Sequence, residues 1–351
     1  MPKRAASEGG DLKLTALLAD FRLLVILFIG LRMMMLMVYE PIMIDGIERG
    51  VGAQGDRAYH YALSALSADG KLPFRDWWSE FPPVWYFLTT AVYQFQGANA
   101  NYTAWSMLLG LIMVAFDTGN LILIRKIGTR LHGPGTGMSL AWIYAVLFAP
   151  LVFLWWNFET IVAFWLLLGL WWLLDHRSTR SAVAVALGAL TKFTPALLFG
   201  AVFRFRSLPE ALRYVAIAVG LFALAYLPLL MQNAAMTLPS LTAQFGKSSY
   251  ETAWALIDGN YRTGNFGDVA SHFDPAQALA QTGNPAVVPG WLRLVAAAVI
   301  GVFVFARTRR FDRPGSRHQR VRAAGLGDLD RGHRLGKRFR HVVSRLFEMS
   351  G

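Results

Sequence analysis

The chain has 351 residues, of which 55% are hydrophobic and only 16% are charged, and its mean hydropathy is +0.38. Soluble domains carry about 25% charged residues, so this composition excludes an ordinary soluble domain. The apolar residues gather in runs long enough to cross a bilayer, which needs about 20 residues each. The chain has no cysteine, which excludes disulfides, thiolate catalysis and cysteine-based metal sites. We expect an all-α, polytopic helical membrane protein.

The net charge of +12 is concentrated at the C-terminus, because residues 307–351 hold 13 Lys/Arg against 4 Asp/Glu. The basicity therefore belongs to a tail and does not indicate a nucleic-acid partner. This tail is rich in Arg and Gly and lacks sustained apolar periodicity. We expect either a disordered segment attracted to anionic lipid or non-native residues produced by a frameshift, and we favour the second interpretation.

Six apolar runs predict membrane-spanning helices, at residues 23–39, 103–124, 137–155, 161–174, 211–231 and 290–306. The first run contains Arg32 and leads into Glu40-Pro41 without a small-residue cleavage site, so we interpret it as an uncleaved span rather than a signal peptide. Residues 1–22 are then a cytoplasmic N-terminus, and residues 23–306 form one transmembrane domain.

Two further apolar stretches, 84–95 and 181–205, leave the topology open. The first is short enough for an interfacial helix, and the second is interrupted by TKFTP at 191–195, where Pro195 disfavours a continuous helix. If neither crosses, the basic residues that follow 124, 174 and 205 are cytoplasmic, while the loops 40–82 and 232–289 are external. If both cross, only the middle of the chain is inverted, and its basic loops lie outside. We prefer the first arrangement, in which 181–205 is a re-entrant pair of short helices beside a cavity.

The first external loop holds the candidate catalytic residue, Asp56. A carboxylate at the membrane face can act as a general base that deprotonates a sugar hydroxyl. The alternative is a solvated loop residue or a helix cap ahead of residues 57–67. Trp77, Trp78 and Trp85 in the same loop fit an aromatic belt at the membrane surface.

Other polar residues are candidates for binding substrate. Asp76 and Glu80 would share a face if RDWWSEFPP were helical. Lys192 lies in an apolar stretch and suits a phosphate, although snorkelling to the surface also explains it. Glu159 and the mid-span Asp117 can instead hydrogen-bond neighbouring helices. Lys247 and Arg262, in the second external loop, are candidates for contacting a lipid phosphate; simple solvation of that loop is an equal alternative.

The first loop also resembles a known family of enzymes. Asp56 stands three residues before Tyr59, and GKLPFRDWWSEFPPVW is similar to the G-x-x-P-[YF]…E-[YF]-P-P-[LV] run of the GT-C integral membrane glycosyltransferases, in the branch of polyprenyl-phosphate-dependent mannosyltransferases. The segment LTKFTP is similar to the Lys-x-x-Pro segment of that family. The resemblance covers roughly residues 20–306.

This resemblance implies a GT-C fold whose external first loop carries interfacial helices and a catalytic carboxylate. The implied reaction moves a hexose, with mannose the best guess, from a polyprenyl-phosphate sugar to a glycan or glycolipid acceptor at the outer face of the plasma membrane, with inversion. Asp56 would be the base, and Tyr59, Asp76, Glu80 and Lys192 would bind substrate. Ala58 replaces the second Asp of the Asp-x-Asp often found in relatives, so we expect no obligatory metal. The alternatives are an inactive truncated pseudo-enzyme or membrane scaffold, and then a transporter or flippase.

Overall fold

The computed structural model describes residues 14–52, 56–147, 151, 154–155, 157–246, 252–259, 268–279 and 287–308. Over these residues the protein is almost entirely helical, and the only sheet is a hairpin of β1 (Ile42–Ile44) and β2 (Ile47–Arg49). The predicted all-α membrane fold is therefore confirmed. The chain divides into two units, residues 1–293 and 294–351. The helical bundle described below belongs to the first unit.

Four helices of the described part are long and apolar enough to cross a membrane: α2 (Phe21–Val38), α5 (Tyr102–His132), α11 (Leu208–Thr237) and α14 (Gly290–Thr308). Each overlaps a span predicted from the sequence. Asp20 caps α2 by accepting a hydrogen bond from Arg22 N at 2.8 Å. The α5 helix continues beyond the predicted end, so the basic residues expected in the following loop lie on its last turns.

Two predicted spans form shorter helices, α6 (Pro134–Val146) and α8 (Glu159–Leu174). The expectation of one continuous helix over 137–155 is wrong. The helix ends at Val146, and Leu147 has an extended backbone with φ −62° and ψ 128°. Pro150 follows three positions later, and a proline both lacks a backbone donor and disfavours helix at the residue before it.

The ambiguous stretch 181–205 reverses direction. It forms α9 (Ser178–Ala189), η3 (Thr194–Leu197) and α10 (Leu198–Phe205), with TKFTP at the bend between α9 and α10. The amides of Thr191 and Lys192 both donate to Gly188 O at 2.9 Å, which closes the end of α9.

Both flanks of this reversal lie at one end of the bundle. Arg206, just after α10, donates at 2.6 Å to Leu173 O, in the last turn of α8, and α9 begins at Ser178 after a short turn. The two ends of this pair of short helices thus lie at the same end of the bundle, an arrangement that fits the re-entrant interpretation. A small apolar cavity of about 160 Å³ borders the bend and is lined in part by Ala189, Phe193 and Phe222.

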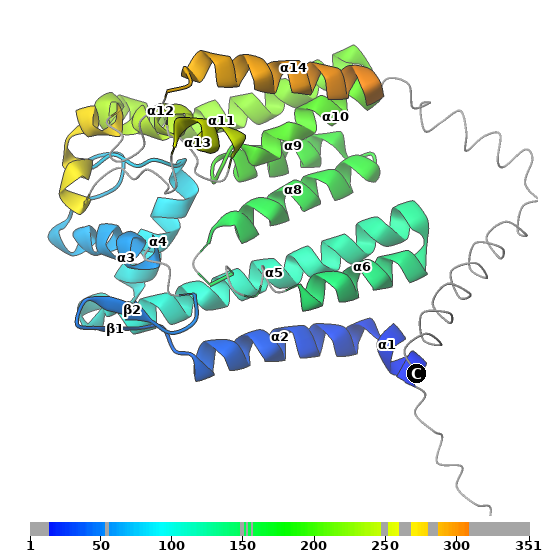
Figure 1. Cartoon of the computed structure of the whole chain (residues 1–351), viewed down its shortest axis with the longest axis horizontal. Helices are drawn as coiled ribbons and strands as arrows, with labels where there is room; N and C mark the ends of the chain where they lie inside the picture. Colours follow the sequence, from blue (N-terminus) through cyan, green and yellow to red (C-terminus); the bar gives the residue numbers. More distant parts are fainter. Residues whose placement is uncertain are drawn as a thin grey trace, which may run out of the picture. The chain divides into compact units, whose positions relative to one another are not determined.

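The turns between helices divide the bundle into two ends (Figure 1). The basic end holds the α5–α6, α8–α9 and α10–α11 turns and the start of α2. Its cations include Arg130, Arg177, Arg180, Arg206 and Arg213. The loop end holds the hairpin and the short elements of the two long loops.

The loop-end elements of the first long loop are α3 (Asp56–Ala65), η1 (Leu66–Asp69), α4 (Pro83–Phe95) and η2 (Gly97–Asn99). The α4 helix has 13 residues, too few for a bilayer crossing, and it runs across the direction of α5 (Figure 1). The described part of the second long loop contributes four short elements: α12 (Pro239–Gly246), α13 (Ala253–Asp258), η4 (Val269–Phe273) and η5 (Pro275–Leu279). The six-residue α1 (Leu14–Ala19) precedes α2.

The three loop tryptophans are buried, which corrects the prediction of an aromatic belt. Trp77, Trp78 and Trp85 are 1%, 0% and 0% exposed. Trp77 and Trp85 pack in the main core where the first loop meets the ends of the long helices, and Trp78 packs against Ala243 and Ala278 of the second loop. Trp78 Nε1 donates to Ser271 O at 3.0 Å and to Asp274 O at 2.9 Å, whereas the indole N–H groups of Trp77 and Trp85 have no acceptor among the described residues.

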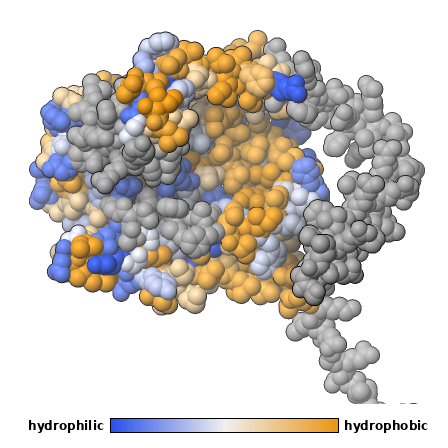
Figure 2. All heavy atoms as spheres, in the orientation of Figure 1, coloured by the Kyte–Doolittle hydropathy of each residue, from blue (hydrophilic) through white to orange (hydrophobic). Residues whose placement is uncertain are grey.

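Large apolar side chains cover the outside of the long helices. Ile26 on α2 is 66% exposed, and Leu224 and Met231 on α11 are 66% and 79% exposed. In Figure 2, hydrophobic residues dominate the surface over the bundle, whereas hydrophilic ones gather toward the loop end. Such continuous apolar surface is unfavourable in water and suits a lipid environment.

Candidate active site

Asp56 is the first residue of α3, and its neighbour Arg57 holds that helix in place. The Arg57 guanidinium is fully buried and donates to Glu48 Oε1 at 2.8 Å, to Tyr102 OH at 2.9 Å and to Val51 O at 2.8 Å. These acceptors lie on β2, on α5 and in the connection after the hairpin. Because one buried side chain joins three elements, the exposed Asp56 beside it has a defined position at the helix N-terminus.

The β-hairpin that supplies Glu48 was missed in the sequence interpretation. Its turn is Asp45-Gly46, with φ of 49° and 73°. Positive φ at both central residues is the requirement of a type I′ hairpin turn, and an Asp-Gly pair between apolar runs is the signal that predicts it.

Tyr59, one turn after Asp56, bonds to a residue far along the chain. Its hydroxyl pairs with Nε2 of His272, which lies on η4. His272 Nδ1 lies 2.6 Å from Trp78 O, and a carbonyl can only accept, so Nδ1 carries the hydrogen. Burial lowers the pKa of His272, which favours the neutral ring. Nε2 is then the acceptor, and the Tyr59 O–H donates to it.

Burial and the carboxylates of Glu80 and Asp56 all raise the pKa of Tyr59. Burial raises the pKa of the Tyr59 phenol well above its ordinary value, and the negative charges of Glu80 and Asp56 raise it further. The same causes raise the pKa of Tyr86, on α4. Glu80 is 7% exposed. Asp56 and Glu80 thus come from opposite ends of the first loop in sequence. Both carboxylates nevertheless lie close enough to the Tyr59 phenol to raise its pKa.

Lys192 and Glu159 form an ion pair at the bend between α9 and α10. The two side chains are 36% and 45% exposed, so a ligand can reach them. Lys192 Nζ lies 5.8 Å from the ring centre of Phe81 and 5.6 Å from that of Phe158. Phe81 directly follows Glu80, so the ion pair borders the first loop.

A backbone bond ties these two parts together. Val84 N, at the start of α4, donates to Leu190 O at 2.9 Å, two residues before Lys192. Asn157 Oδ1 accepts from Glu159 N at 2.9 Å and fixes the start of α8. The structure therefore places two groups at the loop end: Asp56 and Glu80 around Tyr59, and the Lys192–Glu159 pair beside Phe81, the residue after Glu80.

Asp76 does not share a helix face with Glu80. The segment RDWWSEFPP is not helical, so the condition under which Asp76 and Glu80 would face the same way is not met. Asp76 Oδ2 accepts from Leu72 N at 2.7 Å and pairs with Arg75 at 2.7 Å. The hydrogen bond from Arg75 lowers the pKa of this carboxyl. Asp76 closes its own turn.

The second long loop contributes a residue that the sequence interpretation missed. Lys247 and Arg262 lie outside the described residues. His272 instead links this loop to the first one, stacking on Trp78 with ring centres 4.2 Å apart. A local signal was present, because Asp268 caps η4 by accepting from Ser271 N at 3.1 Å. That signal predicts a turn but not its partner.

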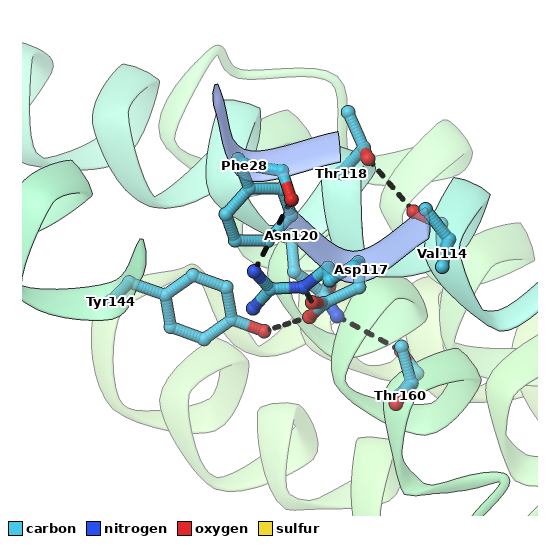
Figure 3. Close-up of polar contacts among 8 residues, drawn as sticks. Phe28, Val114, Asp117, Thr118, Asn120, Tyr144 and Thr160 are labelled. Carbon is cyan, nitrogen blue, oxygen red and sulfur yellow. Dashed lines mark hydrogen bonds and ion pairs between the residues drawn. The ribbon is translucent and has the colours of Figure 1, made fainter. Parts of the chain in front are cut away.

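The mid-span Asp117 has a structural partner (Figure 3). Arg32 Nε on α2 donates to Asp117 Oδ2 on α5 at 2.7 Å, and both side chains are buried, at 0% and 1% exposed. Tyr144, on α6, donates to the other carboxylate oxygen. Asn120 Nδ2 donates to Thr160 O on α8 at 3.0 Å. This buried cluster joins α2, α5, α6 and α8 inside the bundle. Asp117 therefore bonds neighbouring helices and does not face substrate.

Among the described residues, no group of three or more His, Asp or Glu side chains is arranged to hold a metal ion. The loop-end carboxylates are engaged with a phenol and an ammonium group instead. The chemistry that this set offers is proton transfer by a carboxylate and binding of an anion by Lys192.

The sequence matches the family model described as glycosyltransferase family 87 over residues 80–328. Glu80, Glu159, Lys192 and His272 lie within the match, whereas Asp56 and Tyr59 precede it. The match continues beyond Ala306, where we expected the family resemblance to end. Neither the curated proteins nor the solved structures gave a match. Since the match covers more than half of the chain, the protein belongs to glycosyltransferase family 87 and is a membrane glycosyltransferase of the GT-C type.

Proposed function

We propose that this protein transfers a hexose, with mannose the best guess, from a polyprenyl-phosphate sugar to a lipid or glycan acceptor, with inversion at the anomeric carbon. The observation that supports the proposal is that the exposed Lys192–Glu159 pair borders Phe81, which directly follows Glu80 of the loop-end carboxylates. The loop-end carboxylates can activate an acceptor hydroxyl, and the Lys192–Glu159 pair can meet a phosphate. The two are joined by the backbone bond from Val84 to Leu190.

In this mechanism Asp56 is the general base. The acceptor oxygen attacks the anomeric carbon as the bond from that carbon to the phosphate oxygen breaks, and Asp56 takes the hydroxyl proton. The leaving group is the polyprenyl phosphate, whose negative charge Lys192 stabilises by exchanging its partner from Glu159 to the phosphate. Asp56 suits the first role because its carboxylate is exposed at the loop end.

Glu80 and Tyr59 have a supporting role in this proposal. Glu80 is buried beside Tyr59, which is fixed by its bond to His272. A rigid phenol and a carboxylate offer a hydrogen-bond donor or acceptor pattern that suits sugar hydroxyls. We retain Asp76 only as a residue that shapes the loop near the substrate, because its oxygens are already bonded within its own turn.

We further propose that the loop end faces the outside of the plasma membrane. The support is the distribution of charge, since Arg130, Arg177, Arg180, Arg206 and Arg213 lie at the opposite end, whereas the loop-end Arg57 and Arg75 are paired with carboxylates. Cytoplasmic ends of membrane helices carry the excess of Lys and Arg. A lipid-linked donor would then meet the site at the outer leaflet. No metal is required in this mechanism, since Lys192 supplies the positive charge.

The test uses the purified full chain in nanodiscs with polyprenyl-phosphate mannose or glucose and a membrane-lipid acceptor. We expect transfer by the parent and a loss of about 10²–10⁴-fold in rate for Asp56→Asn, the range of general-base catalysis. Asp69→Asn is the matched control, because Asp69 is an exposed carboxylate of the same loop. Equal transfer by parent and Asp56→Asn removes Asp56 from catalysis. No transfer by a folded parent with either donor favours the pseudo-enzyme.

A further inference from the structure

A second polar site lies at the basic end of the bundle, opposite the candidate active site. A cavity of about 450 Å³ opens between the α8–α9 turn and the start of α11. Nine residues from these two regions line it: His176, Arg177, Ser178, Thr179, Arg180, Glu210, Arg213, Tyr214 and Ile217. The glycosyl-transfer proposal uses none of them.

The charge of this cavity is positive, and its one carboxylate is already engaged. Glu210 Oε1 accepts from Ser178 Oγ at 2.5 Å and lies 3.7 Å from Arg206 Nε. Within the part of the chain that the structure describes, no carboxylate pairs with Arg180 or Arg213. Two guanidinium groups thus line one cavity without an acidic partner, and a guanidinium fork matches the oxygens of a phosphate.

The backbone adds to the positive potential. The 12-residue α9 begins at Ser178, in the wall of the cavity, and no side chain caps its N-terminus in the described structure. Amide hydrogens of a first helical turn have no partner within the helix, and the helix dipole favours an anion near them. Together with Arg180 and Arg213, these amides make the cavity suitable for a bulky anion.

The wall of the cavity formed by Tyr214 and Ile217 is apolar, and the Tyr214 hydroxyl already has a hydrogen-bond partner. Ser181 Oγ donates to Gly169 O at 2.7 Å, so the Tyr214 hydroxyl donates to Ser181 Oγ at 2.8 Å. Tyr214 is 1% exposed and offers a ring face rather than a free polar group. Ile217 lies one helical turn further into the apolar part of α11. The cavity is therefore cationic at its rim and apolar toward the interior of a membrane.

We propose that this cavity binds the phosphate-bearing headgroup of an anionic phospholipid from the leaflet at the basic end. The headgroup lies between Arg180 and Arg213, and the start of an acyl chain packs along Ile217. Free phosphate shares the anionic chemistry, but the apolar depth and the place of the cavity at the end of the membrane helices favour the lipid. The site is independent of glycosyl transfer.

The test is native mass spectrometry of the full chain in detergent, titrated with phosphatidylglycerol, phosphatidylcholine or inorganic phosphate. We expect the parent to retain phosphatidylglycerol in preference to phosphatidylcholine. Arg180→Gln with Arg213→Gln is expected to weaken phosphatidylglycerol binding about 30-fold, since each of the two cations near a lipid surface adds about 1 kcal/mol. The control is Arg22→Gln with Arg130→Gln, which removes two exposed arginines of the same end outside the cavity.

Several outcomes would overturn the proposal. These are equal retention of both lipids, equal weakening by the control pair, and displacement of the lipid by equimolar phosphate, which would assign a free-anion site. If the double glutamine variant does not fold, Ile217→Trp fills the cavity without changing any charge and is expected to remove the preference for phosphatidylglycerol. Unchanged binding by a folded Ile217→Trp protein would exclude the lipid from this cavity.

Discussion

At the scale of single residues, His272 holds the two long loops together. Its ring accepts from Tyr59, donates to Trp78 O and stacks on the Trp78 indole, while its backbone carbonyl accepts from Trp78 N at 2.9 Å. Every polar atom of this histidine ring is therefore used in the neutral state. A proton added to Nε2 would remove the acceptor that Tyr59 needs.

This arrangement predicts a pH dependence of stability. The pKa of His272 is lowered in the folded state, so the unfolded chain binds the proton more readily. Stability is then fully present above the ordinary value of 6.5 and is lost as the pH falls below it. We expect the melting temperature of the parent to fall between pH 7.5 and 5.5, and that of His272→Asn to change less. His132→Asn, at an exposed histidine, is the control, and a parent-like pH response in His272→Asn contradicts the assignment.

The buried ion pair between α2 and α5 gives a second prediction. Removing one partner of a buried pair leaves an isolated charge and costs about 3–5 kcal/mol. We expect Arg32→Met and Asp117→Asn each to lower the free energy of unfolding by about that amount. The double variant has no buried charge, and the amide that replaces the carboxylate still offers an oxygen to Tyr144, so it should be more stable than either single variant. Additive losses in a detergent unfolding experiment would argue against a coupled pair.

At the scale of elements, the bend after α9 depends on a glycine. A Cβ on Gly188 would lie 2.7 Å from Pro195 Cγ and 2.7 Å from Trp165 Cβ. Pro195 therefore folds back onto α9 only because position 188 has no side chain. The same turn carries Lys192 to Glu159, so the close contact positions a proposed phosphate-binding residue.

Gly188→Ala should therefore destabilise the bend by about 1–3 kcal/mol, the usual cost of overpacking. Gly200→Ala is the matched control, because it also lies in a short helix of this pair and a Cβ there meets nothing within 4 Å. Alanine favours helix over glycine, so the control should be neutral or slightly more stable. Thermal unfolding of both variants measures the difference, and equal melting temperatures would contradict the close packing.

At the scale of the whole bundle, polar function is divided between two ends. The loop end holds the acidic and aromatic residues of the candidate active site, and the basic end holds the arginines and the cavity beside α11. Apolar side chains cover the helices in between. This division is what a membrane imposes, because charged groups favour its two surfaces.

The orientation can be measured because the 351 residues contain no cysteine. We expect a single cysteine at Ala98, exposed at the loop end, to react in intact cells with a membrane-impermeant maleimide. A cysteine at Gly135, in the first turn of α6 at the basic end, should react only after the cells are opened. The opposite pattern would place the candidate active site in the cytoplasm.

How much of the structure could be predicted from the sequence depends on how many neighbouring residues each sequence signal involves. Hydropathy located α2, α5, α11 and α14, because a lipid-facing helix needs a continuous apolar run. The arginines within 177–180 and 204–213, with TKFTP between them, predicted that both flanks of the α9–α10 pair lie at one end of the bundle. Pro150 and Asp45-Gly46 were local signals that were available but not used.

Local patterns were thus enough to predict the class of protein, the positions of most spans and the acidic first loop with Asp56, Tyr59 and Glu80. The pairs of distant residues that meet became visible in the folded chain: His272 with Tyr59, Lys192 with Glu159, and Arg32 with Asp117. This difference arises because hydropathy and turn propensity act over a few residues. A buried hydrogen bond or ion pair is instead specified by how helices pack, and the same packing buried the tryptophans that composition alone placed at the membrane surface.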